Sequence, residues 1–200
     1  MQTETEIQKL IDLLKDPSWV VRSNAADALG DLGAKEAIPY LIALLNDSSC
    51  TARRSAVQAL GKLGEKEAIT YLIALLNDSD DDVRYATIIA LMQLGSKEAI
   101  PYLIDLLFND SSWVVRSKAA EALGQLGAKE AITNLIAAIK DKNWVVQHSA
   151  VQALGKLGAK EAIPYLIALL NDPDDDVRCA TIVALGDLGA KEAIKHLIAL

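Results

Sequence analysis

The chain has 200 residues, of which 52% are hydrophobic, and its formal net charge is −7 because 27 acidic residues outnumber 20 basic ones. This charge disfavours nucleic acids and anionic membrane surfaces as partners, since proteins that bind either need a basic face. The sequence has no run of about 18 apolar residues that would span a membrane. Its N-terminus lacks the basic and then apolar pattern of a secretory signal, so we expect a cytoplasmic protein.

The first 15 residues are predicted to form an N-terminal capping helix. They align with the second half of a longer unit that is repeated along the rest of the chain. Gln8, Lys9 and Asp12 stand at positions where the later units carry less polar residues. A polar outer face of this kind keeps the end of a repeat array soluble.

The motif Lys-Glu-Ala-Ile marks the repeat, and it occurs six times at spacings of 31 residues, with a single spacing of 32. A fixed period in this range indicates an array in which each unit buries its apolar face against its neighbours. The units begin at residues 16, 47, 78, 110, 141 and 172. We predict an all-α fold, an α-solenoid of about six helix pairs, that forms a single domain over residues 1–200.

Each unit holds two helical patterns, and the unit at residues 16–46 shows both. The first helix is predicted to start at the N-cap Asp16, with Pro17 at its first position, and to end at Gly33 in the left-handed conformation. The second helix is predicted to hold Pro39 in its first turn and to end near Asn46. Alanines are frequent in the first helix, which lets neighbouring helices approach closely. The predicted buried faces comprise Val21, Ala25, Ala28, Leu29 and Leu32 in the first helix and Ile38, Leu41, Ile42, Leu44 and Leu45 in the second.

The units form two copies of a block of three. The segment Trp19–Ser23 recurs at Trp113–Ser117, and Ser55–Gly64 recurs at Ser149–Gly158, both at an offset of 94 residues. The one extra residue of the array lies within Asp105–Asp110 and marks the junction. Either the duplication carries no functional content, or it matches a partner that has a twofold repetition of its own.

Three motifs recur through nearly the whole chain: Asp-(Pro/Ser)-x-x-x-Val-Arg at the start of one helix, Ala-Leu-Gly-x-Leu-Gly at its end, and Glu-Ala-Ile-Pro-x-Leu-Ile-x-Leu-Leu in the next. These motifs resemble the HEAT-like repeats of the phycobilin-lyase type, and artificial consensus repeat proteins are similar as well. The resemblance implies a right-handed superhelix in which the Val-Arg helix lies on the concave side and binds proteins. Members of that family include bilin lyase subunits and plain scaffolds, between which the fold alone does not choose.

Several positions of the first helix vary from unit to unit within this constant frame, which is typical of a binding surface. All three tryptophans of the chain share one such position, and tryptophan is enriched at interface hot spots. The alternative is that each tryptophan packs against a neighbouring turn as part of the core. The residues predicted to bind a protein partner on the concave face are Trp19, Ser23, Arg54, Tyr85, Trp113, Ser117, Trp144, His148, Gln152 and Cys179.

An arginine recurs at one position of the first helix, and Gln147 replaces it in the fifth unit. The planar guanidinium can bridge several acceptors, and we expect each arginine to tie an aspartate or a carbonyl of a neighbouring turn rather than to bind a ligand. Gln147 then marks a weaker link. This arginine ladder comprises Arg22, Arg53, Arg84, Arg116 and Arg178.

The acidic and sulfur-containing side chains predict neither a metal site nor a disulfide. Asp78, Asp80 and Asp82 have the spacing of a calcium loop, but the glycine and the glutamate of an EF-hand loop are missing. We expect these aspartates to cap a helix instead. Cys50 and Cys179 lie four units apart, beyond the reach of a disulfide, and are expected to be free thiols. No cofactor is predicted.

The function predicted from these features is a non-enzymatic scaffold for protein–protein interaction. No pairing of a nucleophile with a base and no phosphate-binding loop can be recognised in the sequence. The alternative is a bilin lyase subunit or a tetrapyrrole-binding chaperone, which the family resemblance alone supports. At the C-terminus, Ile194, Leu197 and Leu200 have no following helix to cover them, so we also expect self-association through that end.

Overall fold

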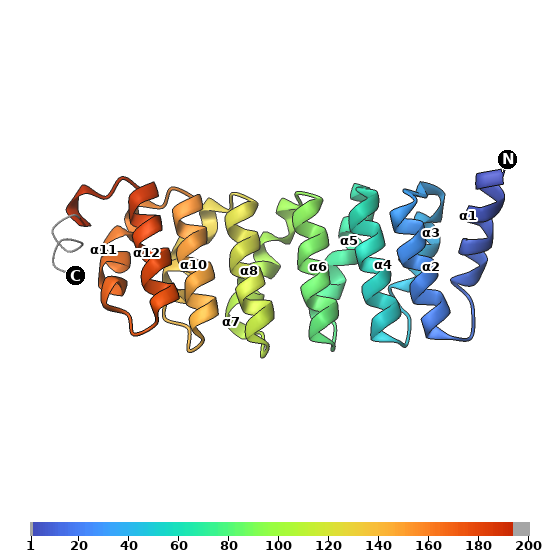
Figure 1. Ribbon diagram of the computed structural model, residues 1–200, viewed down its shortest axis with the longest axis horizontal. Coiled ribbons are helices and arrows are strands. Elements are labelled where there is room, and N and C mark those ends of the chain that lie inside the picture. The colour runs from blue at the N-terminus through green and yellow to red at the C-terminus, as the bar shows by residue number, and fades with distance from the viewer. Residues whose placement is uncertain (1, 194–200) are drawn as a thin grey trace. The chain divides into compact units, whose positions relative to one another are not determined.

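The computed structural model describes residues 2–193, and every regular element in this range is a helix (Figure 1). The predicted all-α fold of repeated helix pairs is therefore confirmed. The chain divides into two compact units, unit 1 (Met1–Ser96) and unit 2 (Lys97–Leu200). A single domain over residues 1–200 stays a prediction. The apolar residues of the 194–200 segment, through which we expect self-association, lie outside the described residues.

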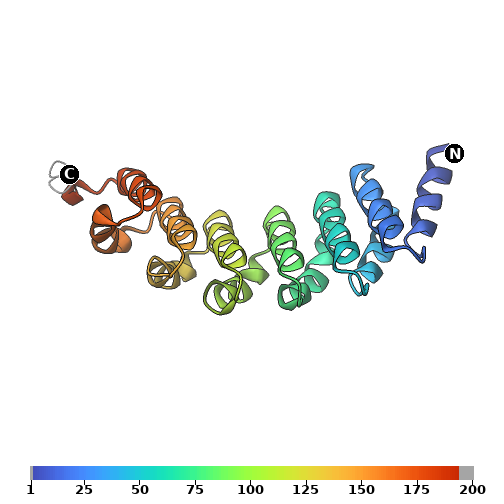
Figure 2. The same ribbon diagram turned by 60° about the horizontal axis from the view of Figure 1, so that its bottom comes forward.

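The helices of unit 1 are α1 (Gln2–Leu13), α2 (Trp19–Asp31), α3 (Ile38–Leu44), α4 (Cys50–Leu63), α5 (Ile69–Ala74) and α6 (Asp81–Gln93), and its 3₁₀ turns are η1 (Lys35–Ala37), η2 (Lys66–Ala68) and η3 (Leu75–Asn77). The first helices of three repeats, α2, α4 and α6, lie side by side in one layer (Figure 2). The second helices α3 and α5 pack against α4 and α6 respectively, and α1 packs against α2. The Lys-Glu-Ala motif forms the 3₁₀ turn before each second helix, η1 before α3 and η2 before α5.

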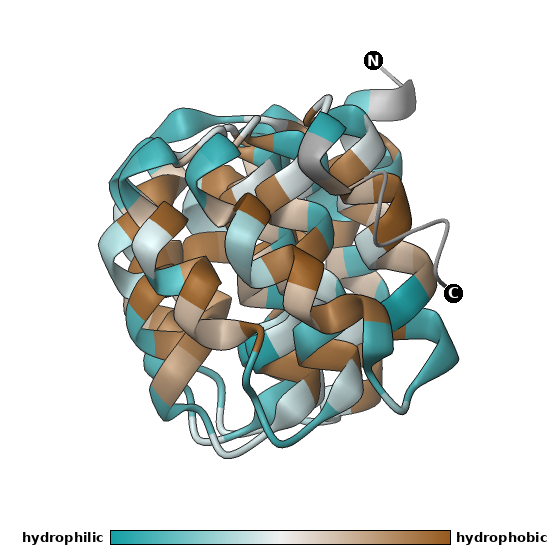
Figure 3. Ribbon diagram, turned by 90° about the vertical axis from the view of Figure 1, so that its left-hand side faces the viewer, coloured by the Kyte–Doolittle hydropathy of each residue, from teal (hydrophilic) through white to brown (hydrophobic). Residues whose placement is uncertain are grey.

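The helices of unit 2 are α7 (Ile100–Asn109), α8 (Trp113–Gln125), α9 (Ile132–Ala138), α10 (Trp144–Lys156), α11 (Ile163–Ala168) and α12 (Asp175–Asp187), with 3₁₀ turns η4 (Lys97–Ala99), η5 (Lys129–Ala131), η6 (Lys160–Ala162), η7 (Leu169–Asn171) and η8 (Lys191–Ala193). Here α8, α10 and α12 are the neighbouring first helices, and α7, α9 and α11 pack against them. Hydrophobic residues lie along the helices, whereas the turns that connect them are mostly hydrophilic (Figure 3).

The first helices begin two residues later than predicted. In the first repeat the N-cap is Ser18, so both Asp16 and Pro17 precede α2. The Asp16 carboxylate accepts a hydrogen bond of 2.8 Å from the Ser18 N–H, which forms an Asx turn in place of a helix cap. The same bond recurs from Ser49 to Asp47 at 2.8 Å. This turn is therefore a property of the repeat.

The ends of the helices agree with the predictions. Gly33 has a φ of +66°, the left-handed conformation that closes a helix. Pro39 lies in the first turn of α3, and this helix ends at Leu44, close to Asn46. The equivalent glycines also have positive φ: Gly64, Gly95, Gly127, Gly158 and Gly189.

The predicted buried face of α2 is only partly correct. Ala25 and Leu29 are buried, but Val21 is half-buried and Leu32 is 61% exposed. Its equivalent in α4, Leu63, is only 7% exposed. The two helices differ in what precedes them: α2 follows the single capping helix α1, whereas α4 follows another first helix, α2. Of the residues predicted for the second helix, Leu41, Leu44 and the C-cap Leu45 are buried, whereas Ile38 and Ile42 are half-buried.

Glycines within the first helices bring neighbouring helices into close contact. A Cβ atom added to Gly30 would lie 2.8 Å from the Cα atom of Ala59, and one added to Gly124 would lie 2.9 Å from that of Ala153. No side chain fits at these distances, so α2 meets α4, and α8 meets α10, almost backbone to backbone. The expectation that small residues allow close helix approach is confirmed.

Candidate partner-binding surface

The arginine ladder joins a repeat to the turn that opens the next one. The Arg22 guanidinium donates two hydrogen bonds of 2.7 Å to the Asp47 carboxylate, and its Nη1 also donates to the Asp16 carbonyl at 2.7 Å. Arg53 and Arg116 form the same fork with the aspartates of their following repeats, at 2.7 Å and at 2.9–3.0 Å. Such bidentate pairs are strong and directional. The structural role expected of the ladder is thus confirmed.

The ladder ion pairs shift the pKa values of their members. Hydrogen bonds from Arg22 hold the pKa of the Asp47 carboxyl below its ordinary value, although burial acts in the opposite direction. Burial raises the pKa of the Asp78 carboxyl, but hydrogen bonds from Arg53 and from a backbone N–H outweigh it, and the pKa is lowered. The same balance lowers the pKa of Asp141. All three carboxyls are therefore ionised at neutral pH, and the links between repeats are ionic.

A groove of about 560 Å³ crosses the first helices α2, α4 and α6, and we call it the unit 1 groove. Ser23, Arg54 and Tyr85, all members of the predicted site, line it. Arg54 lies 3.5 Å from the Asp82 carboxylate, which also belongs to the lining. Lys62 adds a second basic group on the same face of α4, about two helical turns beyond Arg54. The unit 1 groove therefore offers charges of both signs beside one aromatic ring.

A second groove of about 520 Å³ lies between α10 and α12, and we call it the unit 2 groove. Its lining includes the predicted site residues His148, Gln152 and Cys179, and the His148 ring lies 3.4 Å from the Gln152 amide. Ser117 lies on α8 and does not line this groove; its hydroxyl is 2.9 Å from that of Ser149, and the two share a hydrogen bond. Three of the predicted binding residues therefore line this groove, and Ser117 does not.

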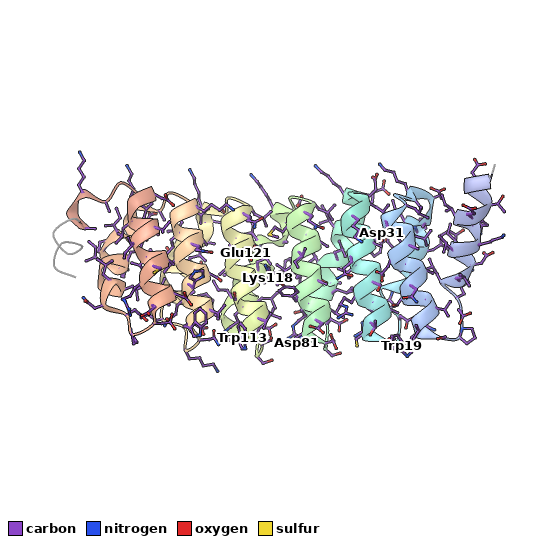
Figure 4. The ribbon with its side chains drawn as sticks, viewed as in Figure 1. Trp19, Asp31, Asp81, Trp113, Lys118 and Glu121 are labelled. Carbon is purple, nitrogen blue, oxygen red and sulfur yellow. The ribbon has the colours of Figure 1, made fainter. Side chains whose placement is uncertain are left out.

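The three tryptophans lie outside both grooves, at the first residue of α2, α8 and α10. Trp19, Trp113 and Trp144 are 48%, 44% and 44% exposed, so they are not part of the core between repeats. In Figure 4, Trp19 and Asp31 lie at opposite ends of α2, and Trp113 lies at the N-terminal end of α8. In each unit the predicted binding residues therefore fall into two sets: side chains that line a groove, and a tryptophan edge at the start of the first helices, which is Trp19 in unit 1 and Trp113 and Trp144 in unit 2.

The predicted site omits several residues that line the grooves. Lys62 and Ile89 belong to the unit 1 groove, and Lys156, Val183 and Asp187 belong to the unit 2 groove. Each lies one or two helical turns beyond a predicted residue on the same helix, so it shares that residue's face. Helical periodicity, followed to the end of each helix, is the signal that identifies them.

The cysteines and the acidic turns behave as expected. Cys50 is half-buried, Cys179 is exposed, and both are free thiols. The Asp80 carboxylate caps α6 by accepting a hydrogen bond of 3.2 Å from the Val83 N–H, the role that we expected in place of calcium binding. Over residues 2–193, no three His, Cys, Asp or Glu side chains are placed to hold a metal ion. No helix in that range has the length and apolar character needed to cross a membrane.

Comparisons with known proteins give one family and several similar structures. The profile described as HEAT repeats matches residues 7–92, 72–153 and 132–200. A structure of the complex of CpcE and CpcF of phycocyanin lyase from Nostoc sp. PCC7120 contains a similar chain, with 30% identity and a TM-score of 0.68 over 94% of this chain and 80% of that one. No curated protein gives a significant match.

Artificial repeat proteins share the fold. A designed armadillo repeat protein in complex with the peptide (KR)4 has 21% identity and a TM-score of 0.68, over 92% of this chain and 99% of that one. An engineered protein has 23% identity and a TM-score of 0.66, over 91% and 98%. Both resemblances that the sequence motifs indicated, to the lyase type and to artificial repeats, are confirmed.

Proposed function

Because the chain belongs to the HEAT-repeat family, we propose that it is a non-enzymatic scaffold that binds a protein partner across the first helices of its repeats. The observation that carries the proposal is that each unit has a groove on these helices, lined by side chains that differ from repeat to repeat. We further propose, on the strength of the family resemblance, that these helices form the concave face and that the partner binds there.

The groove linings suit a polypeptide that has its own pattern of charges. The unit 1 groove presents the Arg54–Asp82 pair next to Tyr85, and the unit 2 groove presents the imidazole of His148 next to Val183, which is 62% exposed. Complementary charges of this kind give a protein interface its specificity. The tryptophan edge adds large aromatic anchors, which dominate the binding energy of many interfaces.

The side chains of the unit 2 groove favour binding over catalysis. A cysteine nucleophile needs a base within hydrogen-bond reach. Cys179 and His148 line the same groove, but among the hydrogen bonds of the described residues the His148 ring is joined to Gln152 and not to the thiol. The imidazole therefore acts as a polar contact for a partner.

The proposed function is tested by capturing partners from an extract of the source cell on immobilised protein and identifying them by mass spectrometry. The double variant Arg54→Glu/Tyr85→Ala disrupts the unit 1 groove. Tyr71→Ala is the matched control, because Tyr71 is 52% exposed on α5 and does not line the groove. We expect a specific partner to bind the wild type and the control but not the groove variant. A partner that all three proteins retain, with equal helical circular dichroism, would reject the groove as its site.

A second candidate function is that of a bilin lyase subunit or a tetrapyrrole-binding chaperone. The similarity to a chain of the phycocyanin lyase complex, at 30% identity over 94% of this chain, favours it. Visible absorbance after mixing with a linear tetrapyrrole distinguishes the two candidates. A new band that stays with the protein through gel filtration would support the tetrapyrrole function, whereas an unchanged spectrum would favour the scaffold.

Two further properties belong to the proposal. A cytoplasmic location agrees with the free thiols of Cys50 and Cys179, which persist in a reducing compartment. Self-association through residues 194–200 would make the apparent mass rise with concentration. Light scattering across a dilution series measures it directly.

A further inference from the structure

One aspartate of unit 2 lacks the arginine that binds its equivalents. Asp47 and Asp141 each accept two hydrogen bonds from the arginine that lies 25 residues earlier. Asp172 has the same place in the sixth repeat, but the residue 25 positions before it is Gln147. Among the hydrogen bonds of the described residues, the Asp172 carboxylate accepts one of 3.0 Å from the Asp174 N–H and none from a guanidinium.

Gln147 makes only one of the two interactions that a ladder arginine makes: it binds the backbone carbonyl of its own repeat but not the aspartate of the next repeat. Its Nε2 donates to the Asp141 carbonyl at 2.8 Å, just as Nη1 of Arg53 donates to the Asp47 carbonyl at 2.8 Å. The glutamine side chain is shorter and has no planar fork that could also reach Asp172. Gln147 therefore stabilises the turn of the fifth repeat, but it forms no ionic link to the sixth repeat.

A cavity of about 390 Å³ lies where the missing guanidinium would be. Its lining holds two carboxylates and one ammonium group, so it is acidic on balance. Arg178, which follows in α12, forms no fork with the Asp172 carboxylate, because its Nη1 donates to the Asp172 backbone carbonyl at 2.6 Å and its Nη2 pairs with Asp175. The lining residues are Lys142, Trp144, Gln147, Asp172, Pro173 and Asp174.

Trp144 gives this cavity an aromatic wall. In the first and fourth repeats, Trp19 and Trp113 precede the ladder arginines Arg22 and Arg116 by three residues, so an indole and a guanidinium share one helical turn. In the fifth repeat Trp144 is present and 44% exposed, but Gln147 takes the place of the arginine, so there is no guanidinium beside the indole. A cation held over the indole face is attracted by the ring.

We propose that this cavity binds an arginine side chain of the protein partner, which completes the arginine ladder in trans. The Asp172 carboxylate accepts the guanidinium fork and the Trp144 indole stacks on its plane. An ammonium group lacks the planar fork, so the site selects arginine over lysine. The site rests on the proposed function only for the source of the arginine, and free arginine is the other source of the same chemistry.

The test is a titration with N-acetyl-arginine methylamide, followed by NMR through the indole N–H signals of the three tryptophans. In the wild type we expect a saturable shift of the Trp144 signal, about tenfold weaker binding of the lysine analogue, and no binding of the uncharged citrulline analogue. Gln147→Arg restores the ladder within the chain and abolishes the response. Free arginine is expected to bind more weakly, because its own carboxylate meets those of Asp172 and Asp174.

The variant Arg22→Gln should create an equivalent arginine site in unit 1. It leaves Asp47 without its fork beside Trp19, as Asp172 is beside Trp144. We expect the Trp19 signal of this variant to acquire the arginine-dependent shift. Should the variant fail to fold, the comparison of wild type with Gln147→Arg decides alone.

A Trp144 shift that survives Gln147→Arg, or that the citrulline analogue reproduces, would overturn the arginine site. Binding of free arginine without binding of the blocked derivative would overturn the partner as its source. If no response is seen while a partner is still captured through the unit 1 groove, the arginine site is rejected and the proposed function stands. If the arginine response is seen but no partner is captured through the unit 1 groove, the arginine site is supported and the groove-bound partner is rejected.

Discussion

Unit 1 and unit 2 hold their helices together by the same contacts. Leu60 and Leu154, which are 94 residues apart, are both completely buried. Gly30 and Gly124, at the same offset, each press against an alanine of the next first helix, at 2.8 Å and 2.9 Å from an added Cβ atom. Such positions tolerate little change, because a larger side chain has no room and a smaller one leaves a cavity.

The two units share the packing of their helices but differ in the side chains that line their grooves. At the same offset of 94 residues, Arg54 is exchanged for His148 and Tyr85 for Cys179. These side chains line open grooves and none is fully buried, so the packing of the helices limits them less than it limits the residues between the helices. A partner with a twofold repetition would need two similar linings. The difference therefore favours two distinct binding surfaces built on one duplicated frame.

The largest effect is expected at the tryptophan edge, of which unit 2 has two members and unit 1 has one. Trp113→Ala and Trp144→Ala are expected to weaken partner binding by about 2 kcal/mol or more each. The free energy of unfolding should fall by about 1 kcal/mol or less, since nearly half of each side chain is exposed. Calorimetric titration with the captured partner and urea unfolding measure the two effects.

Tyr165→Ala is the control for the tryptophan variants, because Tyr165 is 48% exposed on the second helix α11. It should change neither quantity by a similar amount. Losses of several kcal/mol in unfolding free energy for both tryptophan variants, with binding unchanged, would mean that the tryptophans are core residues and that the edge has no role in binding.

The shared frame is tested by adding one methyl group in each unit. Gly30→Ala and Gly124→Ala are expected to lower the free energy of unfolding by about 1–3 kcal/mol through overpacking, although alanine favours a helix by about 1 kcal/mol. Gly186→Ala should raise it by about 0.5–1 kcal/mol, because a Cβ atom there meets nothing within 4 Å. Urea unfolding that gives a clearly different cost at Gly30 and Gly124 would show that the two frames are not equivalent.

The sequence predicts those features that depend on neighbours within one repeat. The period, the left-handed Gly33, the position of Pro39 and the bridging role of Arg22 all follow from local spacing. Burial depends in addition on which helix lies alongside. Leu32 was expected to be buried but is exposed, since α2 is preceded by the capping helix α1 and not by another first helix.

The candidate site shows the same limit. Arg54, Tyr85, His148 and Cys179 share one position of the repeat and all line grooves, so periodicity was enough to find them. Ser117 shares that position too, yet its hydroxyl bonds to another serine of the neighbouring helix. Ser23, at the same repeat position and opposite the equivalent serine Ser55, does line the unit 1 groove. Repeat position and the opposing residue are therefore not enough to predict which helices border a groove.

One position of the ladder differs between the two units: unit 1 has an arginine where unit 2 has a glutamine. Substituting each residue by the other should change the free energy of unfolding in opposite directions. Arg53 and Gln147 are 94 residues apart. Arg53→Gln should lower the free energy of unfolding by about 1 kcal/mol, because the largely buried Asp78 loses its fork, while solvent screening limits the cost. Gln147→Arg should raise it by about 0.5–1 kcal/mol. Thermal or urea unfolding that ranks the variants in the opposite order would contradict a stabilising role for the ladder.

The smallest expected effect is the pH dependence of the stability that the Arg53–Asp78 pair contributes. This dependence separates the ionic contribution of Arg53 from the contribution of its packing. The pKa of Asp78 is lowered in the folded protein from an ordinary value of 3.8. A lowered folded-state pKa contributes stability that is present above the unfolded value and is lost as the pH falls through the folded value. The loss of unfolding free energy caused by Arg53→Gln should therefore be constant from about pH 7 to pH 5 and shrink below about pH 4. Because protonation of Asp78 removes the ion pair from the wild type alone, a loss that stays the same in acid would mean that the arginine acts through packing and its backbone contact.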